Sequence, residues 1–251
     1  MVRVNASRLR RLTALETHRL PDPTSSHETR ANAVLRPVVF GANDGLVSNL
    51  ALVMGVAGAN AAAPVIVLAG IAGLLAGAFS MGVGEYISVQ SQRELLEFQL
   101  AFQRHQLQGA PEQEHRILRD IYIGRGFEPE EATRFVDRLF EQPEQATRLL
   151  IFEEVGLDER SIGSPVLAGV GSFLAFTLGA AVPLVPYLLA RGEIAFSASL
   201  AASFVALLGL GFGISRLTHR SALYSSIRQL LLGAVAAAVT YGVGTLLGAT
   251  L

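Results

Sequence analysis

Two carboxylic acids lie within stretches of the chain that are otherwise almost free of charge. Asp44 follows Arg36 by eight residues, and Glu85 precedes Arg93 by eight. If both stretches cross a membrane as antiparallel helices, the two acids lie at one depth, roughly 12 Å inward of the same edge at about 1.5 Å per residue. An acid inside a membrane costs about 2.5 kcal/mol or more, and it usually marks ion or proton traffic.

Oxygen and sulfur ligands share the helical faces of these two acids. Residues three or four apart stack along a helix, so Ser48 lies one turn from Asp44, while Met81 and Ser88 flank Glu85. Carboxylate and hydroxyl oxygens suit many divalent ions, and a thioether adds preference for softer transition metals. The set predicts a site for iron, manganese or a similar ion. The alternatives are that Met81 fills a gap in a helix interface and that the acids form structural hydrogen bonds or are polar groups at helix ends.

The composition indicates a membrane protein. Hydrophobic residues make up 51% of the 251 residues, which exceeds the usual fraction in water-soluble domains. Charge is dense in residues 1–36 and 93–160 and almost absent elsewhere. The chain has no cysteine, so disulfides and thiolate ligands are excluded. A net charge of −1 lacks the basic excess that nucleic acid requires.

Five apolar stretches are long enough to cross about 30 Å of hydrocarbon, which takes roughly 20 helical residues. Backbone groups cannot stay unpaired in lipid, so these lengths predict an all-α membrane protein. The predicted spans are Val38–Ala59, Pro64–Val89, Pro165–Leu189, Ile194–Ile214 and Ile227–Leu251. The chain divides into a tail (1–36), two spans (37–90), a soluble insert (91–164) and three further spans (165–251).

The insert between the second and third spans has the pattern of short helices. Residues 91–107 continue the second span without a break and predict one long rod. Proline and glycine positions then mark three more helices, Glu112–Ile123, Pro129–Phe140 and Pro143–Val155.

The distribution of arginine predicts the orientation. All twenty basic residues are arginines: the tail has seven, the insert nine, the loop after the fourth span three, and the remaining connection one, Arg191. Positively charged loops stay in the cytoplasm, which puts the N-terminus and the insert inside and the C-terminus outside. The all-arginine set favours a bacterial plasma membrane. We expect a cytoplasmic tail, helical near Ala6–Leu15 and disordered around Pro21–Ser26; an arginine-rich transit peptide is the alternative.

Two segments resemble signatures of the vacuolar iron transporter family. Phe40–Ser48 resembles the signature of its first span, and Ser80–Ser88 resembles that of its second. The five spans, the insert and the pair Pro183–Pro186 fit as well, so the resemblance covers Arg36 to the end. It implies a homodimer whose first spans line a metal path at the interface and which exports ferrous or related ions in exchange for protons. Such a protein is a transporter in the lipid membrane, neither an enzyme nor a cofactor carrier.

The resemblance also implies roles for individual residues in the membrane. Asp44 and Met81 match positions that the family uses to bind metal, and Glu85 matches a frequent acidic position beside them. A glutamate that the family has earlier in the second span falls on Gly73 here.

The insert departs further from the family pattern. Its relatives gather metal there with several glutamates and a methionine pair, of which this chain retains Glu114 and Glu153. Two carboxylates bind divalent ions more weakly than a cluster, and His105 and His115 are alternative ligands. The other expected ligand positions fall on Gln103, Gln106, Ile117, Leu149 and Leu150.

Two further functions stay open at this stage. One is a membrane-anchored ferritin-like iron-binding protein or oxidase; Glu112 and His115 have the Glu-x-x-His spacing of di-iron bundles, although such bundles need two of these motifs. The other is a non-transporting interaction protein whose metal site has decayed. In the transporter hypothesis, one carboxylate alternates between metal and proton. Ligand types alone do not decide among iron, manganese, cobalt and zinc.

Overall fold

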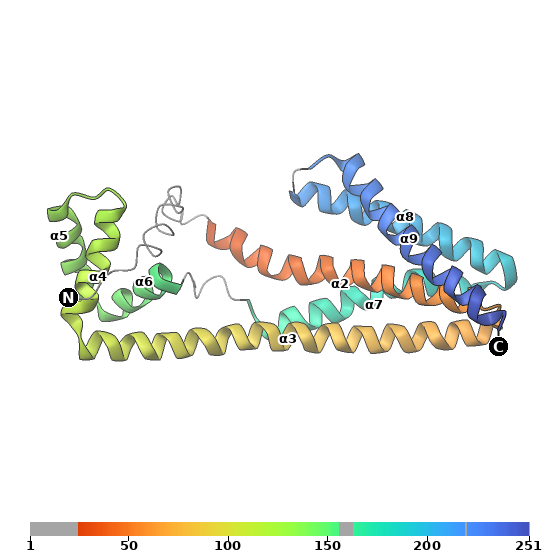
Figure 1. Cartoon of the computed structure of the whole chain (residues 1–251), viewed down its shortest axis with the longest axis horizontal. Helices are drawn as coiled ribbons and strands as arrows, with labels where there is room; N and C mark the ends of the chain where they lie inside the picture. Colours follow the sequence, from red (N-terminus) through yellow and green to blue (C-terminus); the bar gives the residue numbers. More distant parts are fainter. Residues whose placement is uncertain (1–24, 156–162, 219, 251) are drawn as a thin grey trace. The chain divides into compact units, whose positions relative to one another are not determined.

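The computed structural model describes residues 25–155, 163–218 and 220–250. Every regular element within these ranges is an α-helix, as Figure 1 shows. The prediction of an all-α protein is confirmed for the described chain. In order, the helices are α2 (Ser25–Gly58), α3 (Ala63–Gly109), α4 (Pro111–Gly124), α5 (Pro129–Phe140), α6 (Pro143–Val155), α7 (Pro165–Leu189), α8 (Gly192–Thr218) and α9 (Ala222–Gly248).

Five of these helices are long and apolar enough to cross a membrane: the part of α2 from Arg36 to Gly58, together with α3, α7, α8 and α9. The five predicted spans are therefore confirmed as helices of spanning length. The rod predicted after the second span is also confirmed, because α3 runs for 47 residues without interruption. Helix α7 begins where Ser164 caps the first turn, its hydroxyl accepting from the backbone N–H of Leu167, and Pro165 needs no hydrogen-bond acceptor there.

Helix starts differ from the prediction where polar residues lead into a span. Helix α9 begins at Ala222, five residues before the predicted start at Ile227, because a helix continues beyond the segment that lipid requires. Helix α2 begins at Ser25, so the expectation of disorder around Pro21–Ser26 is wrong for Ser25 and Ser26. The remainder of that expectation, like the helix predicted at Ala6–Leu15, lies outside the described residues.

The described chain forms two compact units. One comprises residues 25–31 and 90–155, and the other, here called the membrane unit, comprises residues 32–89 and 163–250. The first unit has its apolar core among α4, α5 and α6. Its fully buried members include Leu118, Val136 and Leu150, while Tyr122 is 4% exposed.

The membrane unit is built around α2, which packs closely against α7 and α9 (Figure 1). A side chain on Gly45 would collide with the carbonyl oxygen of Phe176 in α7, and one on Gly179 with that of Ala42. Towards the other end of α2, a side chain on Gly244 of α9 would collide with the carbonyl oxygen of Gly55. Glycine at such contacts lets helix backbones approach closely, which is how helices associate in lipid.

Candidate metal site

Asp44 lies in α2 with its side chain partly buried. Within the described part of the chain, its carboxylate takes part in no hydrogen bond or ion pair. The hydroxyl of Ser48, one turn further along, donates to the backbone carbonyl oxygen of Asp44 over 2.5 Å. Since that hydroxyl keeps its own lone pairs, a cation beside the carboxylate would find a second oxygen ligand one turn away.

The contacts of its two neighbours determine where Asp44 points. Successive residues lie about 100° apart around an α-helix, so Asn43 and Gly45 flank Asp44 on opposite sides. Asn43 accepts a hydrogen bond from Gln229 of α9, and Gly45 lies against the backbone of α7. Asp44 therefore occupies the sector that neither helix covers. The residue one turn before it, Phe40, is 62% exposed in a single copy.

Glu85 lies on the inward face of α3. It shares that face with Ala78, Gly82 and Val89, all of which are buried, and is itself partly buried. No hydrogen bond or ion pair engages its carboxylate among the described residues. Ser88 is exposed. The position of Glu85 agrees with an acid that faces the bundle.

Met81 lies one turn before Glu85 on the same face of α3, and it also contacts an apolar cluster. It packs against a small core of Ala78, Phe176 and Ala180, which α3 and α7 build together. A role in packing and a role as a ligand both remain compatible with this position. The α7 residue Phe176 also joins the two acid-bearing helices, since its ring lies against Gly77 of α3 and its backbone against Gly45 of α2.

The structure brings the acid-bearing helices into one bundle but records no contact between the carboxylates of Asp44 and Glu85. Across the described ranges, no group of three or more histidine, cysteine, aspartate or glutamate side chains gathers closely enough to hold a metal ion. The described residues of one copy therefore do not supply a complete coordination shell from these residue types.

The space beside Gly73, where the family pattern has a glutamate, is occupied by another side chain. A Cβ on Gly73 would collide with Leu52 of α2 and would lie 3.2 Å from the side-chain oxygen of Asn49. Asn49 is 2% exposed and donates its amide to the carbonyl oxygen of Ala180 over 2.6 Å. The absence of the acid is thus accompanied by a leucine that fills its place.

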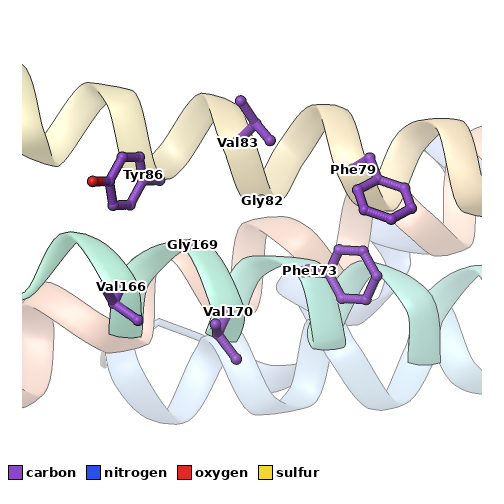
Figure 2. Close-up of a pocket in the computed structure, with 8 residues that line it drawn as sticks. All are labelled: Phe79, Gly82, Val83, Tyr86, Val166, Gly169, Val170 and Phe173. Carbon is purple, nitrogen blue, oxygen red and sulfur yellow. The ribbon is translucent and has the colours of Figure 1, made fainter.

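An apolar groove on the flank of α3 and α7 has a different character. It has a volume of about 240 Å³. Figure 2 shows Gly82 and Gly169 on the facing sides of α3 and α7, and a Cβ on Gly169 would lie 2.8 Å from the carbonyl oxygen of Gly82. The rings of Phe79 and Phe173 close one end, edge to face with centroids 5.2 Å apart. No charged group lines the groove, so it is no candidate for the metal site. Its lining comprises Phe79, Gly82, Val83, Tyr86, Val166, Gly169, Val170 and Phe173.

Glu153, one of two predicted metal ligands in the insert, is already engaged. Both of its carboxylate oxygens accept hydrogen bonds from the guanidinium of Arg125, one of them over 2.7 Å, and its side chain is only 3% exposed. Burial raises the pKa of the neighbouring Tyr122 phenol, and the negative charge of Glu153 raises it further while Arg125 opposes the rise. A metal ion at Glu153 would have to displace Arg125.

The other predicted positions in the insert are buried or partly buried and lie on α3, α4 and α6. Glu114 and Gln103 are 4% and 3% exposed. Leu150 belongs to the apolar core, while Leu149, Gln106 and Ile117 are partly buried. At the two positions where the family has ligands, Leu149 and Leu150 therefore contribute to the apolar packing of the insert.

The histidine alternatives do not form a di-iron motif within the described residues. His115 exchanges a hydrogen bond of 2.7 Å with Asp137 and packs edge to face on Phe140. Glu112, its partner in the Glu-x-x-His spacing, has a side chain that is 93% exposed and lies 3.9 Å from Arg116. His105 is exposed.

Two functional candidates were missed because the sequence was searched for charge. Asn43 and Gln229 are neutral amides inside spans, and the hydrogen bond between them joins α2 to α9 immediately beside Asp44. The sequence does contain one indication of their role: an amide side chain in a membrane helix needs a hydrogen-bond partner, and it usually finds one on a neighbouring helix.

Comparison with known proteins covers most of the chain. The model of the VIT family matches residues 35–245. The chain is 30% identical to vacuolar iron transporter 1 of Eucalyptus grandis over 230 residues, which is 91% of this chain and 92% of that protein. It is also 30% identical to vacuolar iron transporter 2 of Oryza sativa subsp. japonica, over 89% of this chain and 91% of that one. The vacuolar iron transporter of Toxoplasma gondii is 30% identical over 90% of this chain and 78% of its own length.

Proposed function

The chain belongs to the VIT family, and we propose that it carries divalent metal ions, ferrous iron first and manganese second, out of the cytoplasm in exchange for protons. It is an integral, multi-pass membrane protein, and its relatives are named vacuolar iron transporters. We propose a bacterial plasma membrane as its location, with the N-terminus and the unit containing α4, α5 and α6 in the cytoplasm and the C-terminus outside.

The observation that carries this proposal is the state of Asp44. An acid within a spanning helix is expensive unless it meets a partner or a polar path. Asp44 has no partner among the described residues, yet the contacts of Asn43 and Gly45 hold it firmly in the uncovered sector of α2. A carboxylate that is fixed in direction and has no hydrogen-bond or ion-pair partner among the described residues suits a passing cation.

The exchange of metal for protons follows from the chemistry of the ligands. A carboxylate binds a divalent cation only when it is deprotonated, so a proton and a metal ion compete for it. In our proposal Asp44 and Glu85 take the metal from the cytoplasm with help from Ser48 and the thioether of Met81. Protons arriving from outside then neutralise the acids and release the metal outward.

A second copy of the chain completes the site in this proposal. The face of α2 that carries Phe40, Asp44 and Ser48 has two exposed residues, Phe40 and Ser48, on either side of the partly buried Asp44. The described residues of one copy include no group of three or more histidine, cysteine, aspartate or glutamate side chains that could hold a metal ion. Two such faces meeting across a twofold axis bring together two acids and two hydroxyls on a path between the copies. The insert contributes little metal binding, since Glu153 is engaged by Arg125.

Transport by purified protein in liposomes tests the exchange. Vesicles with an acidic interior and a metal-sensitive dye inside should take up ferrous iron or manganese from a neutral medium, and collapsing the pH gradient should stop the uptake. Asp44→Ala should abolish it, whereas Asp120→Ala, which removes an exposed acid of the other unit, should leave it intact. Undiminished uptake by Asp44→Ala would remove that residue from the mechanism.

Crosslinking tests the partner copy directly, because the chain has no cysteine of its own. Ser48→Cys should form an intermolecular disulfide under mild oxidation in membranes. Val205→Cys provides a matched control, since Val205 is 69% exposed and belongs to α8 instead of the face of α2 proposed as the interface. Equal crosslinking at both positions would contradict the assignment of this face.

A further inference from the structure

A single hydrogen bond between side chains links spanning helices within the described membrane unit. The amide nitrogen of Gln229 in α9 donates to the side-chain oxygen of Asn43 in α2. The other polar links between these helices end on backbone carbonyls, for example Ser226 on that of Leu208. Gln229 is 6% exposed and Asn43 is partly buried, so the surrounding helices shield much of the amide pair.

This hydrogen bond is anchored on α2 at Asn43, the residue immediately before Asp44. Because Asn43 lies about 100° to one side of Asp44 and Gly45 about 100° to the other, the two contacts fix the rotation of α2 about its own axis. The contact at Gly45 is made by backbone atoms of α7, and the contact at Asn43 depends on one side chain of α9. Without Gln229, α2 keeps only the first of these two restraints at this height.

We infer that Gln229 is a positioning residue for cation transport: through Asn43 it holds Asp44 toward the path. The inference rests on the proposed function of Asp44. It assigns a role in the cation site to α9, a helix that contributes none of the proposed ligands. The expected consequence is specific, because a misdirected carboxylate binds the cation less well while the translocation steps that follow binding stay the same.

The test compares two buried positions one turn apart on α9. In Gln229→Leu, the apparent KM for manganese in acid-loaded proteoliposomes should rise roughly three- to tenfold, the size of effect expected from one hydrogen bond between spanning helices, with Vmax changed by less than about twofold. Ser225→Ala alters a residue that is 2% exposed on the same face and contacts α8, and it should leave KM unchanged. Exchanging the amides, with Asn43→Gln and Gln229→Asn together, should restore the KM.

Thermal unfolding in detergent separates positioning from folding. We expect Gln229→Leu to melt close to the wild type while its KM is raised. If Gln229→Leu does not fold, Gln229→Asn keeps the polarity but shortens the side chain by one methylene, which lengthens and weakens the contact with Asn43, and its KM should rise instead. A KM equal to that of the wild type in the folded variant, or an equal rise in Ser225→Ala, would overturn the inference. A wild-type protein that transports no divalent ion would instead refute the proposed function.

Discussion

Replacing Gly45 by alanine tests the close approach of α2 and α7. A Cβ at this position would collide with the carbonyl oxygen of Phe176 and would lie 3.0 Å from the backbone nitrogen of Ala180. Backbone atoms of a packed helix cannot move aside as the end of a flexible side chain can, so α2 must shift as a whole. Overpacking of this kind costs about 1 to 3 kcal/mol.

A loss of stability of this size lowers the melting temperature by a measurable amount. For a chain of this length, each kcal/mol moves the melting temperature by roughly 2 to 4 °C, so Gly45→Ala should melt about 2 to 12 °C below the wild type. The assay is circular dichroism of the detergent-solubilised protein during heating. Because α2 shifts beside Asp44, metal uptake in liposomes should fall as well.

Gly84→Ala is the matched control. Gly84 lies in the spanning part of α3, and a Cβ there would meet no atom within 4 Å. Alanine at an open helical position stabilises by about 0.4 to 1 kcal/mol, so this variant should melt at or slightly above the wild-type temperature. If Gly45→Ala melted with Gly84→Ala and transported metal normally, the packing of α2 on α7 described above would be wrong.

Three further outcomes follow from the structure. Glu153→Gln should lower the melting temperature, since it removes about 1.5 kcal/mol of charge-assisted hydrogen bonding to Arg125, whereas Arg125→Ala should free the carboxylate and raise manganese binding measured by calorimetry. Burial raises the pKa of Tyr122 above its ordinary value of 10.0, so the contribution of this phenol to stability is complete below pH 10.0 and is lost as the pH rises through the folded pKa. The melting temperature of Tyr122→Phe should therefore fall less steeply than that of the wild type as the pH rises above 10.0. Gly73→Glu should bind manganese more tightly only when Leu52→Ala makes room for it, and equal affinity in the single and double variants would contradict the steric reasoning.

The helices were predictable because membrane and water impose separate constraints. The run of apolar residues fixed α7 at Pro165–Leu189, and the lack of any breaker before Gly109 predicted the length of α3. The start of α2 at Ser25 was not predictable from apolar content, since its first turns need no lipid. Counting charges likewise found Asp44, because an acid inside an apolar run is conspicuous.

The partners of the site residues were not predictable from the sequence. Arg125 and Glu153 lie 28 positions apart, and their pairing depends on how α4 and α6 pack. The pair formed by Asn43 and Gln229 spans 186 positions and joins the first helix of the described chain to the last. Tertiary packing alone decides which of many polar side chains meet.

Proton release during metal binding tests the central claim most directly. Manganese binding to the purified protein is measured by calorimetry in two buffers of different ionisation enthalpy, so that the difference gives the number of protons released per metal. The account predicts release by the wild type, with affinity falling as the pH is lowered, and neither binding nor release in the isosteric variant Asp44→Asn. Binding without proton release in the wild type, or unaltered binding by Asp44→Asn, would contradict it.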